Sequence, residues 1–310
     1  MPSDPRGKSY SNFDAFATCY IAACTCLQER ADVFRIVLEF AEDAVLAGCR
    51  WVEVAPSLQL WCDRFGGMEH AWLLLLEAAA AAEVAMAGKV AIAYIAAVER
   101  HEPVENAESL ATIVASLVHR DLHKIHGRSG IVGFGLHSAE PGNPPQPFAK
   151  AFAIARECGL QSFPHAGELA PGGGVSGVDS IVSALDDLHA DRIHHGTLCH
   201  TDDALVARLI QEEVCLDMCP TSNVLLGVVP SVEAHPLPVL LRKGVHLTIN
   251  SDDPLLFGPR LLEEFNTCRA KLAMTDQELA LAARYSFIHS CAPDAIKAQG
   301  VADIASWLRE

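Results

Sequence analysis

Short apolar runs alternate with stretches whose apolar residues recur at helical spacing, and this rhythm continues along nearly the whole chain. The seven runs that predict strands are Cys49–Ala55, Gly88–Val98, Ile131–Leu136, Leu160–Pro164, Arg192–His194, Val214–Met218 and Val245–Asn250. The stretches that predict helices are two within 13–47, the second at Ala31–Leu46, followed by Glu69–Met86, Ala107–His126, Pro147–Glu157, Gly177–Leu188, Asp202–Gln211 and Pro236–Lys243.

This alternation predicts an α/β fold with parallel strands joined by right-handed crossovers. No Gly-x-Gly-x-x-Gly follows the first strand, so the sequence gives no support to a dinucleotide-binding sheet. Polar groups gather after several strands, where (β/α) barrels carry their chemistry, so we expect a TIM-type barrel. A closed barrel has eight strands and only seven are counted, so the barrel should be incomplete. We expect one domain over residues 1–310, with 276–310 as a helical C-terminal extension.

Composition and charge narrow the class of partner. Half of the 310 residues are apolar, which is enough for a sizeable core. The longest apolar stretch, Ala71–Ala82, contains Glu77 and is shorter than the roughly 20 residues needed to cross a bilayer, so we expect no membrane partner. A formal charge of −16 would repel phosphate backbones, so nucleic acid is not expected either. A small neutral or cationic ligand fits better.

The N-terminus and the cysteines point to the cytoplasm. Residues 1–8 are polar and lack the apolar segment of a signal peptide. The chain has eleven cysteines and no Cys-x-x-Cys pair, which is typical of free thiols in a reducing compartment.

Three polar clusters follow predicted strands and carry the candidate chemistry. Leu160–Glu168 ends in His-Ala-Gly-Glu, and the other two are Arg192–Gly196 and Asn250–Pro254. His165, His195 and Asp252 could together hold a divalent metal and leave a position for water. Such a metal would lower the pKa of that water toward neutrality.

Two further carboxylates in these clusters suit work on a substrate. Glu168 would then donate a proton, and Asp253 would face away from Asp252 and orient the substrate. An alternative for Asp253 is that it caps the helix that begins after Pro254.

Four motifs, in order, are similar to those of the adenosine and adenine deaminase family of the amidohydrolase superfamily. They are His-Ala-Gly-Glu, Arg-Ile-x-His-Gly, Cys-Pro-Thr-Ser-Asn and Ser-Asp-Asp-Pro, and the resemblance extends to Arg100–Pro103 and Pro236–Pro238. The loop Gly135–Pro145 resembles the adenine and aminodeoxyfutalosine deaminase branch more than animal-type adenosine deaminases.

The resemblance implies a barrel of the metal-dependent hydrolase kind that deaminates an aminopurine base or nucleoside with water and releases ammonia. It implies that His165 and Asp252 are zinc ligands and that Glu168 protonates the purine ring. His195 would orient or deprotonate the attacking water. Purine-contacting residues would be Asp253, together with His137 and Ser138 of the third-strand loop, where Ser138 stands at a position that is Gly in the family.

The chain departs from the family at its beginning. Family members start with a strand bearing His-x-His, which supplies two more zinc ligands, whereas residues 1–69 contain no histidine. We therefore expect the absent strand to be the first, and zinc affinity to fall by many orders of magnitude. Zinc is the cofactor that the resemblance implies, and the alternative is that no cofactor is bound. His137, at a position where an acidic residue is common, and the additional His194 could partly substitute.

Three functions stay open on the sequence. The first is deamination in a barrel completed by a missing upstream stretch or a companion chain. The second is metal-independent acid and base chemistry on a nucleoside-like substrate by Glu168, His195 and Asp253. The third is a non-catalytic purine-binding relative, which the retained proton donor disfavours. An open barrel edge would also favour self-association as a homo-oligomer.

Overall fold

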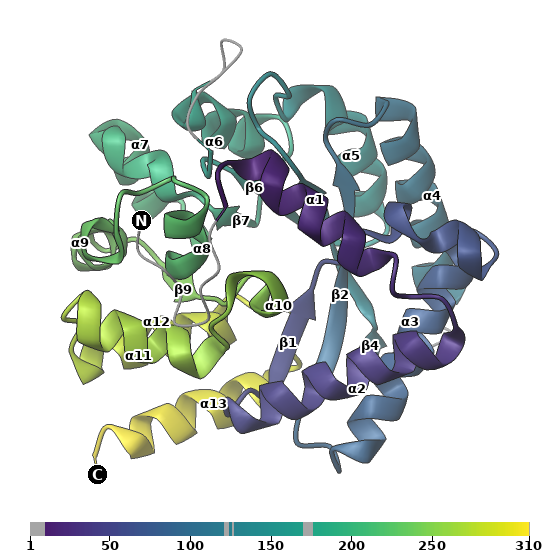
Figure 1. Cartoon of the computed structure of the whole chain (residues 1–310). Helices are drawn as coiled ribbons and strands as arrows, with labels where there is room; N and C mark the ends of the chain where they lie inside the picture. The colour runs from purple at the N-terminus through teal and green to yellow at the C-terminus, as the bar shows by residue number, and fades with distance from the viewer. Residues whose placement is uncertain (1–9, 121–123, 126, 170–175, 310) are drawn as a thin grey trace. The chain divides into compact units, whose positions relative to one another are not determined.

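The computed structural model describes residues 10–120, 124–125, 127–169 and 176–309 (Figure 1). The chain separates into two compact units. Unit 1 comprises Met1–Ala17, Ala139–Pro145 and Pro164–Glu310, and unit 2 comprises Thr18–Ser138 and Gln146–Phe163.

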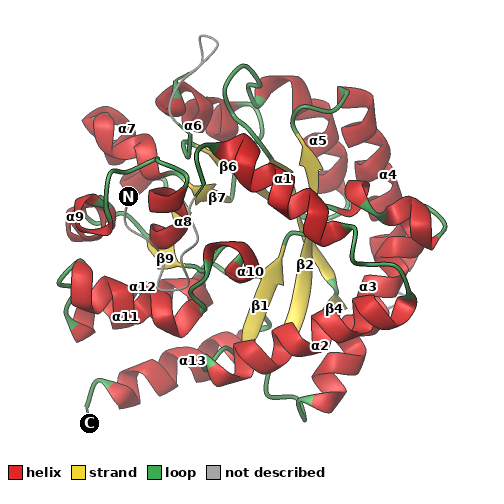
Figure 2. Cartoon of the chain, in the orientation of Figure 1, coloured by secondary structure: helices red, strands yellow, loops and turns green. Residues whose placement is uncertain are grey.

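Unit 2 is built on three parallel strands in the order β1 (Trp51–Val54), β2 (Ala91–Glu99), β5 (Ile131–His137). Figure 2 shows β1 and β2 side by side in yellow. The other elements in this part of the chain are α1 (Phe13–Cys24), which begins in unit 1, α2 (Arg30–Leu46), η1 (Leu58–Leu60), η2 (Cys62–Phe65), α3 (Met68–Ala85), α4 (Val104–Arg120), β3 (Lys124–Ile125), β4 (Arg128–Ser129), η3 (Gln146–Phe148) and α5 (Ala149–Glu157). Within the described ranges, none of the helices has both the length and the apolar character that a membrane span requires.

Unit 1 contains four parallel strands in the order β6 (Gln161–Ala166), which enters the unit at Pro164, β7 (Arg192–His195), β8 (Cys215–Met218), β9 (Leu247–Ile249). Its helices are α6 (Gly177–Asp186), η4 (Thr197–Thr201), α7 (Asp203–Gln211), α8 (Pro220–Leu225), η5 (Val232–Ala234), α9 (Leu237–Lys243), α10 (Pro254–Phe257), α11 (Leu261–Lys271), α12 (Asp276–Ile288) and α13 (Asp294–Trp307). The last two occupy the C-terminal stretch that was expected to be helical.

The strand register of unit 1 lines up four polar residues. His165 pairs with His194, His194 pairs with Asp217, and Asp217 pairs with Thr248. Residues paired in register on neighbouring strands point to the same face of a sheet. The four strands therefore present one continuous polar row, which we call the polar row (His165, His194, Asp217 and Thr248).

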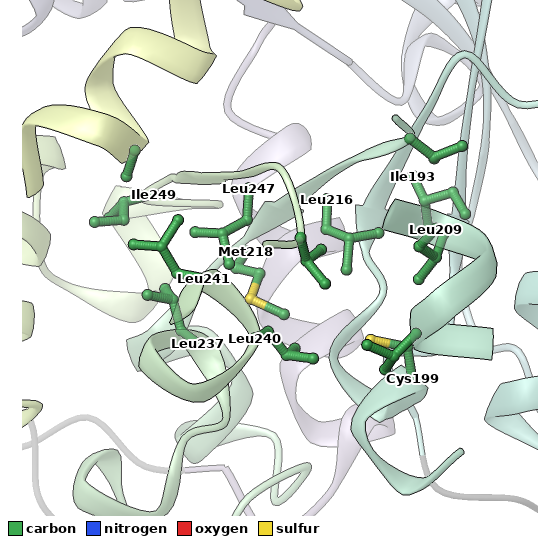
Figure 3. Close-up of a cluster of buried hydrophobic side chains, with 14 of the residues drawn as sticks. Ile193, Cys199, Leu209, Leu216, Met218, Leu237, Leu240, Leu241, Leu247 and Ile249 are labelled. Carbon is green, nitrogen blue, oxygen red and sulfur yellow. The ribbon is translucent and has the colours of Figure 1, made fainter. Parts of the chain in front are cut away.

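The residues next to the polar row point to the opposite face and form the core of the unit. Ile193, Leu216 and Leu247 are all fully buried, and Figure 3 shows them among the leucines of α7 and α9. Each fully buried side chain of this size stabilises the fold by about 1.5–3 kcal/mol relative to an exposed one. Because side chains alternate along a strand, burying this apolar face fixes the polar row on the other.

All seven predicted strands are present among the described residues as parallel strands, so the predicted α/β class is confirmed. The predicted helix Ala107–His126 is wrong at its C-terminal end, because α4 stops at Arg120 and β3 and β4 follow. Gly127 has φ +79° and forms the turn between Ile125 and Arg128, which pair in an antiparallel hairpin. The sequence pattern predicted a helix end at this glycine. A helix C-terminus and a hairpin turn both favour a glycine at positive φ, so the two are hard to tell apart in sequence.

Candidate active site

The His-Ala-Gly-Glu segment forms a tight turn at the end of β6. Gly167 has φ +69°, and a Cβ atom at this position would lie 2.3 Å from Cδ1 of Ile181 in α6. Both the backbone conformation and the close approach of α6 therefore require glycine here. The turn brings Glu168 into the interior of unit 1, where it is only 5% exposed.

A second buried carboxylate, Glu140, holds this turn in place. Its Oε2 accepts hydrogen bonds from the Gly167 backbone N–H at 2.8 Å and the Ser180 hydroxyl at 2.5 Å. Its Oε1 accepts from the backbone N–H groups of Glu168 at 2.6 Å and Leu169 at 3.3 Å. Hydrogen bonds to an ionised acceptor are among the strong ones in proteins, so Glu140 fixes the backbone that carries Glu168.

His195 lies between Glu168 and Asp252. Its Nδ1 atom is 3.6 Å from Oε1 of Glu168, and its Nε2 atom is 4.0 Å from Oδ2 of Asp252. The ring centroid of His165 lies 4.9 Å from that of His195. His195 is 2% exposed, so an imidazole and two carboxylates meet in a largely dehydrated place where their interactions are strong.

A chain of hydrogen bonds assigns the proton of His195. The Leu237 backbone N–H donates to Nδ1 of His235 at 3.2 Å, so the proton of that ring is on Nε2, which donates to Oδ1 of Asn223 at 3.1 Å. The Thr197 hydroxyl donates to the same Oδ1 at 2.7 Å. The Asn223 amide N–H therefore points to Nδ1 of His195 at 3.4 Å, and the His195 proton resides on Nε2, toward Asp252. Burial lowers the pKa of His235 to about 3, which keeps that ring neutral.

The two adjacent aspartates are held together at the end of β9. Asp252 has φ +55° and accepts a hydrogen bond from the Ser222 hydroxyl at 2.5 Å. Burial raises the pKa of Asp253 well above its usual range, and the neighbouring charge and hydrogen bond of Asp252 raise it further. Asp253 precedes α10 at the N-cap position, but its side chain makes no capping hydrogen bond in the described part of the chain. Asp253 therefore lies where a capping residue would lie but does not make the capping hydrogen bond.

The polar row continues this cluster. Nδ1 of His194 is 3.3 Å from Nδ1 of His165, and Nε2 of His194 is 3.6 Å from Oδ2 of Asp217. Arg192 Nε donates to the same Asp217 oxygen at 2.8 Å, and Thr248 Oγ1 donates to its Oδ1 at 2.7 Å. Burial, followed by the positive charge of Arg192 and the neighbouring His195, holds the pKa of His194 well below its usual value.

Five residues predicted from the sequence therefore lie in one cluster within unit 1: His165, Glu168, His195, Asp252 and Asp253. His137 and Ser138 belong to unit 2 and are described there. The His137 carbonyl accepts from the Arg100 backbone N–H at 3.0 Å, and Ser138 has φ +76° with its hydroxyl 3.1 Å from Nδ1 of His101. Their assignment to substrate binding stays a prediction.

Sequence reasoning missed the residues that support the cluster. Glu140, Asn223, His235 and Asp217 act through neighbours that lie far away along the chain, at separations of 12–31 residues. Glu140 and Asn223 occur within the motifs quoted above, which was the signal available. Their partners become visible only in the folded chain.

One group of potential metal ligands within unit 1 is a poor fit for a metal. Ligand atoms of His195, Cys219 and Asp252 lie within 4.8 Å of one another. Burial and the nearby charge of Asp252 raise the pKa of the Cys219 thiol well above its usual value, whereas a metal binds the thiolate. His195 also directs its proton toward Asp252. The polar row offers the better imidazole pair.

Comparison with known proteins identifies relatives over nearly the whole chain. The family model described as Adenosine deaminase matches residues 6–307. A putative adenosine/adenine deaminase of Streptomyces virginiae is 39% identical over 309 residues, which is 99% of this chain and 86% of that protein.

Two solved structures share the fold. The adenine deaminase of Arthrobacter aurescens superposes with a TM-score of 0.86 at 32% identity, covering 97% of this chain and 87% of its own. A cog1816 amidohydrolase from Burkhoderia ambifaria, with bound Zn, has a TM-score of 0.79 at 23% identity, and the match covers 91% of this chain and 74% of that protein's chain. These similarities confirm the predicted TIM-type fold of the amidohydrolase kind.

We predict that Glu140→Gln destabilises the protein by about 1–3 kcal/mol, because an amide removes the charge and turns a donor toward buried N–H groups. Urea denaturation measures the change. The control is Glu39→Gln, which removes a carboxylate 57% exposed and paired with Arg35 on the surface of α2, and should change stability by no more than about 1 kcal/mol. Equal effects of the two substitutions would show that Glu140 does not hold the turn.

Glu264 gives a prediction about pH. It is 1% exposed in α11 next to Thr221, and its Oε2 has no hydrogen-bond partner among the described residues. Burial raises the pKa of Glu264 to about 7, against 4.5 ordinarily. A raised carboxyl pKa contributes stability that is present below the ordinary value and is lost as the pH rises through the folded one.

We therefore expect Glu264→Gln to gain stability relative to the native protein as the pH rises from 5 to 8. The gain should be about 3 kcal/mol, because one pKa unit corresponds to about 1.36 kcal/mol. Urea denaturation of both proteins at several pH values measures it. A difference that does not change with pH would contradict the assignment.

Proposed function

Because the chain belongs to the adenosine deaminase family, we propose that this aminohydrolase deaminates an aminopurine, adenine in preference to adenosine. The observation that carries the proposal is the buried contact between Glu168 and His195, an acid and an imidazole 3.6 Å apart beside Asp252. The preference for adenine is supported by the likeness to the Arthrobacter aurescens adenine deaminase and by the loop Gly135–Pro145.

The reaction requires one water and releases one ammonia. The water oxygen bonds to the ring carbon that bears the amino group, while the ring nitrogen next to it takes a proton from Glu168. His195 carries its own proton on Nε2, so it orients the attacking water through this N–H, and the proton that the water loses passes to the leaving amino group. The carbon–nitrogen bond then breaks, ammonia leaves with the proton from the water, and the added hydroxyl returns a proton to Glu168 as it becomes the carbonyl of the product.

The chain's own residues also position the purine. Asp253 faces the ring and hydrogen-bonds one of its nitrogens, and Asn223 keeps the His195 ring in one tautomer. Ser222 holds the Asp252 carboxylate through a hydrogen bond of 2.5 Å. Glu168 and His195 are thus held side by side in fixed orientations, which general acid–base catalysis needs.

The family is metal-dependent, and the Burkhoderia ambifaria relative has bound Zn. In this chain His165 and Asp252 are the residues that would hold the ion. A bound metal supplies a water of lowered pKa. Metal-independent chemistry by Glu168 and His195 and plain purine binding are the alternatives that the experiment below separates.

The remaining predictions about the protein's surroundings come from its sequence. They are a location in the cytoplasm and association as a homo-oligomer or with a companion chain. We propose both.

We predict that the purified protein releases ammonia from adenine faster than from adenosine or aminodeoxyfutalosine. Glu168→Gln should lower kcat by about 10²–10⁴ with little change in KM, because the amide cannot donate the proton. Ammonia release and purine absorbance measure the reaction, with and without added zinc. The control is Glu157→Gln, which changes an exposed glutamate of α5 and should leave kcat unchanged.

Turnover that survives removal of all metal would support the metal-independent alternative. Purine binding without any chemical change would support the binding relative and overturn the proposed reaction. Full activity of Glu168→Gln would overturn the assignment of Glu168 as the acid.

A further inference from the structure

His194 occupies a position that the family motif leaves open. In Arg-Ile-x-His-Gly the third residue is variable, and here it is a histidine directly before His195. The register of β6 and β7 pairs His194 with His165, the zinc ligand that the family resemblance implies. The fold therefore places a second imidazole beside the first.

The spacing of the two rings fits two ligands of one metal ion. Nδ1 of His165 and Nδ1 of His194 are 3.3 Å apart, and the rings meet at 77° with centroids 4.8 Å apart. Zinc binds histidine nitrogen at about 2.0–2.1 Å in a tetrahedron, which puts two ligand nitrogens about 3.3–3.4 Å apart. The two nitrogens are within hydrogen-bond distance of each other, and their separation also agrees with a shared ion between them.

Another histidine pair in the same unit shows the contrast. Nδ1 of His246 and Nε2 of His289 are 2.9 Å apart, which is the ordinary length of a direct hydrogen bond. His246 also stacks on Tyr285 with a centroid distance of 4.2 Å. This pair is held by a hydrogen bond and an aromatic ring, and its nitrogens are too close for two ligands of a tetrahedral ion.

A carboxylate lies near the outer nitrogen of His194. Its Nε2 atom faces Oδ2 of Asp217 at 3.6 Å, while Nδ1 faces His165. Arg192 and Thr248 fix the two oxygens of Asp217. A histidine ligand usually directs its second nitrogen at a carboxylate or carbonyl, which orients the ring and raises its basicity.

We propose that His165 and His194 together form the seat of a divalent transition metal, zinc by preference. The ion is the one used in the proposed deamination, so this inference rests on that function. Imidazole ligands suit zinc among the biological metals. The remaining positions on the ion are open to water and to the substrate.

The test measures metal binding apart from activity. The full-length protein is stripped with a chelator and titrated with zinc in competition with a coloured chelator, and cobalt(II) is added in parallel to record its absorption spectrum. We expect one zinc per chain in the native protein. His194→Asn and His165→Asn should each weaken zinc binding more than 100-fold and change the cobalt spectrum, since each removes one ligand.

Two further variants keep the test decisive. Asp217→Asn leaves both ligands in place and should weaken zinc binding by about 10–100-fold, the usual effect of removing a group that orients a metal ligand. His246→Asn removes a histidine of the contrasting pair and should leave zinc binding unchanged. Thermal unfolding of each variant shows that the loss of metal is not a loss of fold.

The outcomes separate this inference from the proposed function. Zinc binding that is unaffected in His194→Asn, or absent from the native protein, overturns the inference even if adenine is deaminated. Zinc binding that depends on both His165 and His194 supports it even if no purine is turned over, and in that case the proposed function fails instead.

Discussion

The pairing register of β6, β7, β8 and β9 is the constraint on which the rest of unit 1 depends. It places His165, His194, Asp217 and Thr248 side by side on one face, while Ile193, Leu216 and Leu247 point to the other and pack under helices. A slip of one residue in any of these strands would bury polar groups among leucines, at a cost of several kcal/mol per unpaired group. The same strand register therefore determines both the hydrophobic core and the placement of the site's polar residues.

The ends of these strands carry strain that the surrounding contacts sustain. His195 and Asp252 both adopt positive φ, at +64° and +55°, a conformation that costs a residue other than glycine about 1–2 kcal/mol. His195 is held by Asn223, and Asp252 by Ser222, through side-chain hydrogen bonds from the Cys-Pro-Thr-Ser-Asn turn. Strained residues of this kind gather at functional sites, where the backbone aims a side chain that a relaxed conformation would turn away.

The sequence predicted the strands well because their signal is local. Each run of apolar residues bounded by glycine or polar residues became a strand in the described chain, and His165 and His195 were recognisable at strand ends. The failed end of the helix Ala107–His126 has a local cause too, because a glycine that ends a helix and a glycine that turns a hairpin look alike in sequence. The helices α8 and α11 went unpredicted, and α8 is only six residues long and begins within the Cys-Pro-Thr-Ser-Asn motif.

The supporting contacts of the site could not be predicted in the same way. Glu140 meets the turn at Gly167 across 27 residues, and Asp217 meets Thr248 across 31. No sequence pattern indicates either contact, because both contacts arise from the way strands and loops pack in the folded chain. The sequence therefore named the residues that resemble a catalytic set, and the structure supplied the carboxylates and amides that orient them.

Diffraction from crystals grown with zinc, recorded on both sides of the zinc absorption edge, tests the role of the polar row most directly. We predict one strong anomalous peak within about 2.0–2.1 Å of a ring nitrogen of both His165 and His194, with Asp217 at the far side of the His194 ring. A peak bound to other residues, or His165 and His194 joined by a direct hydrogen bond with no ion between them, would contradict it.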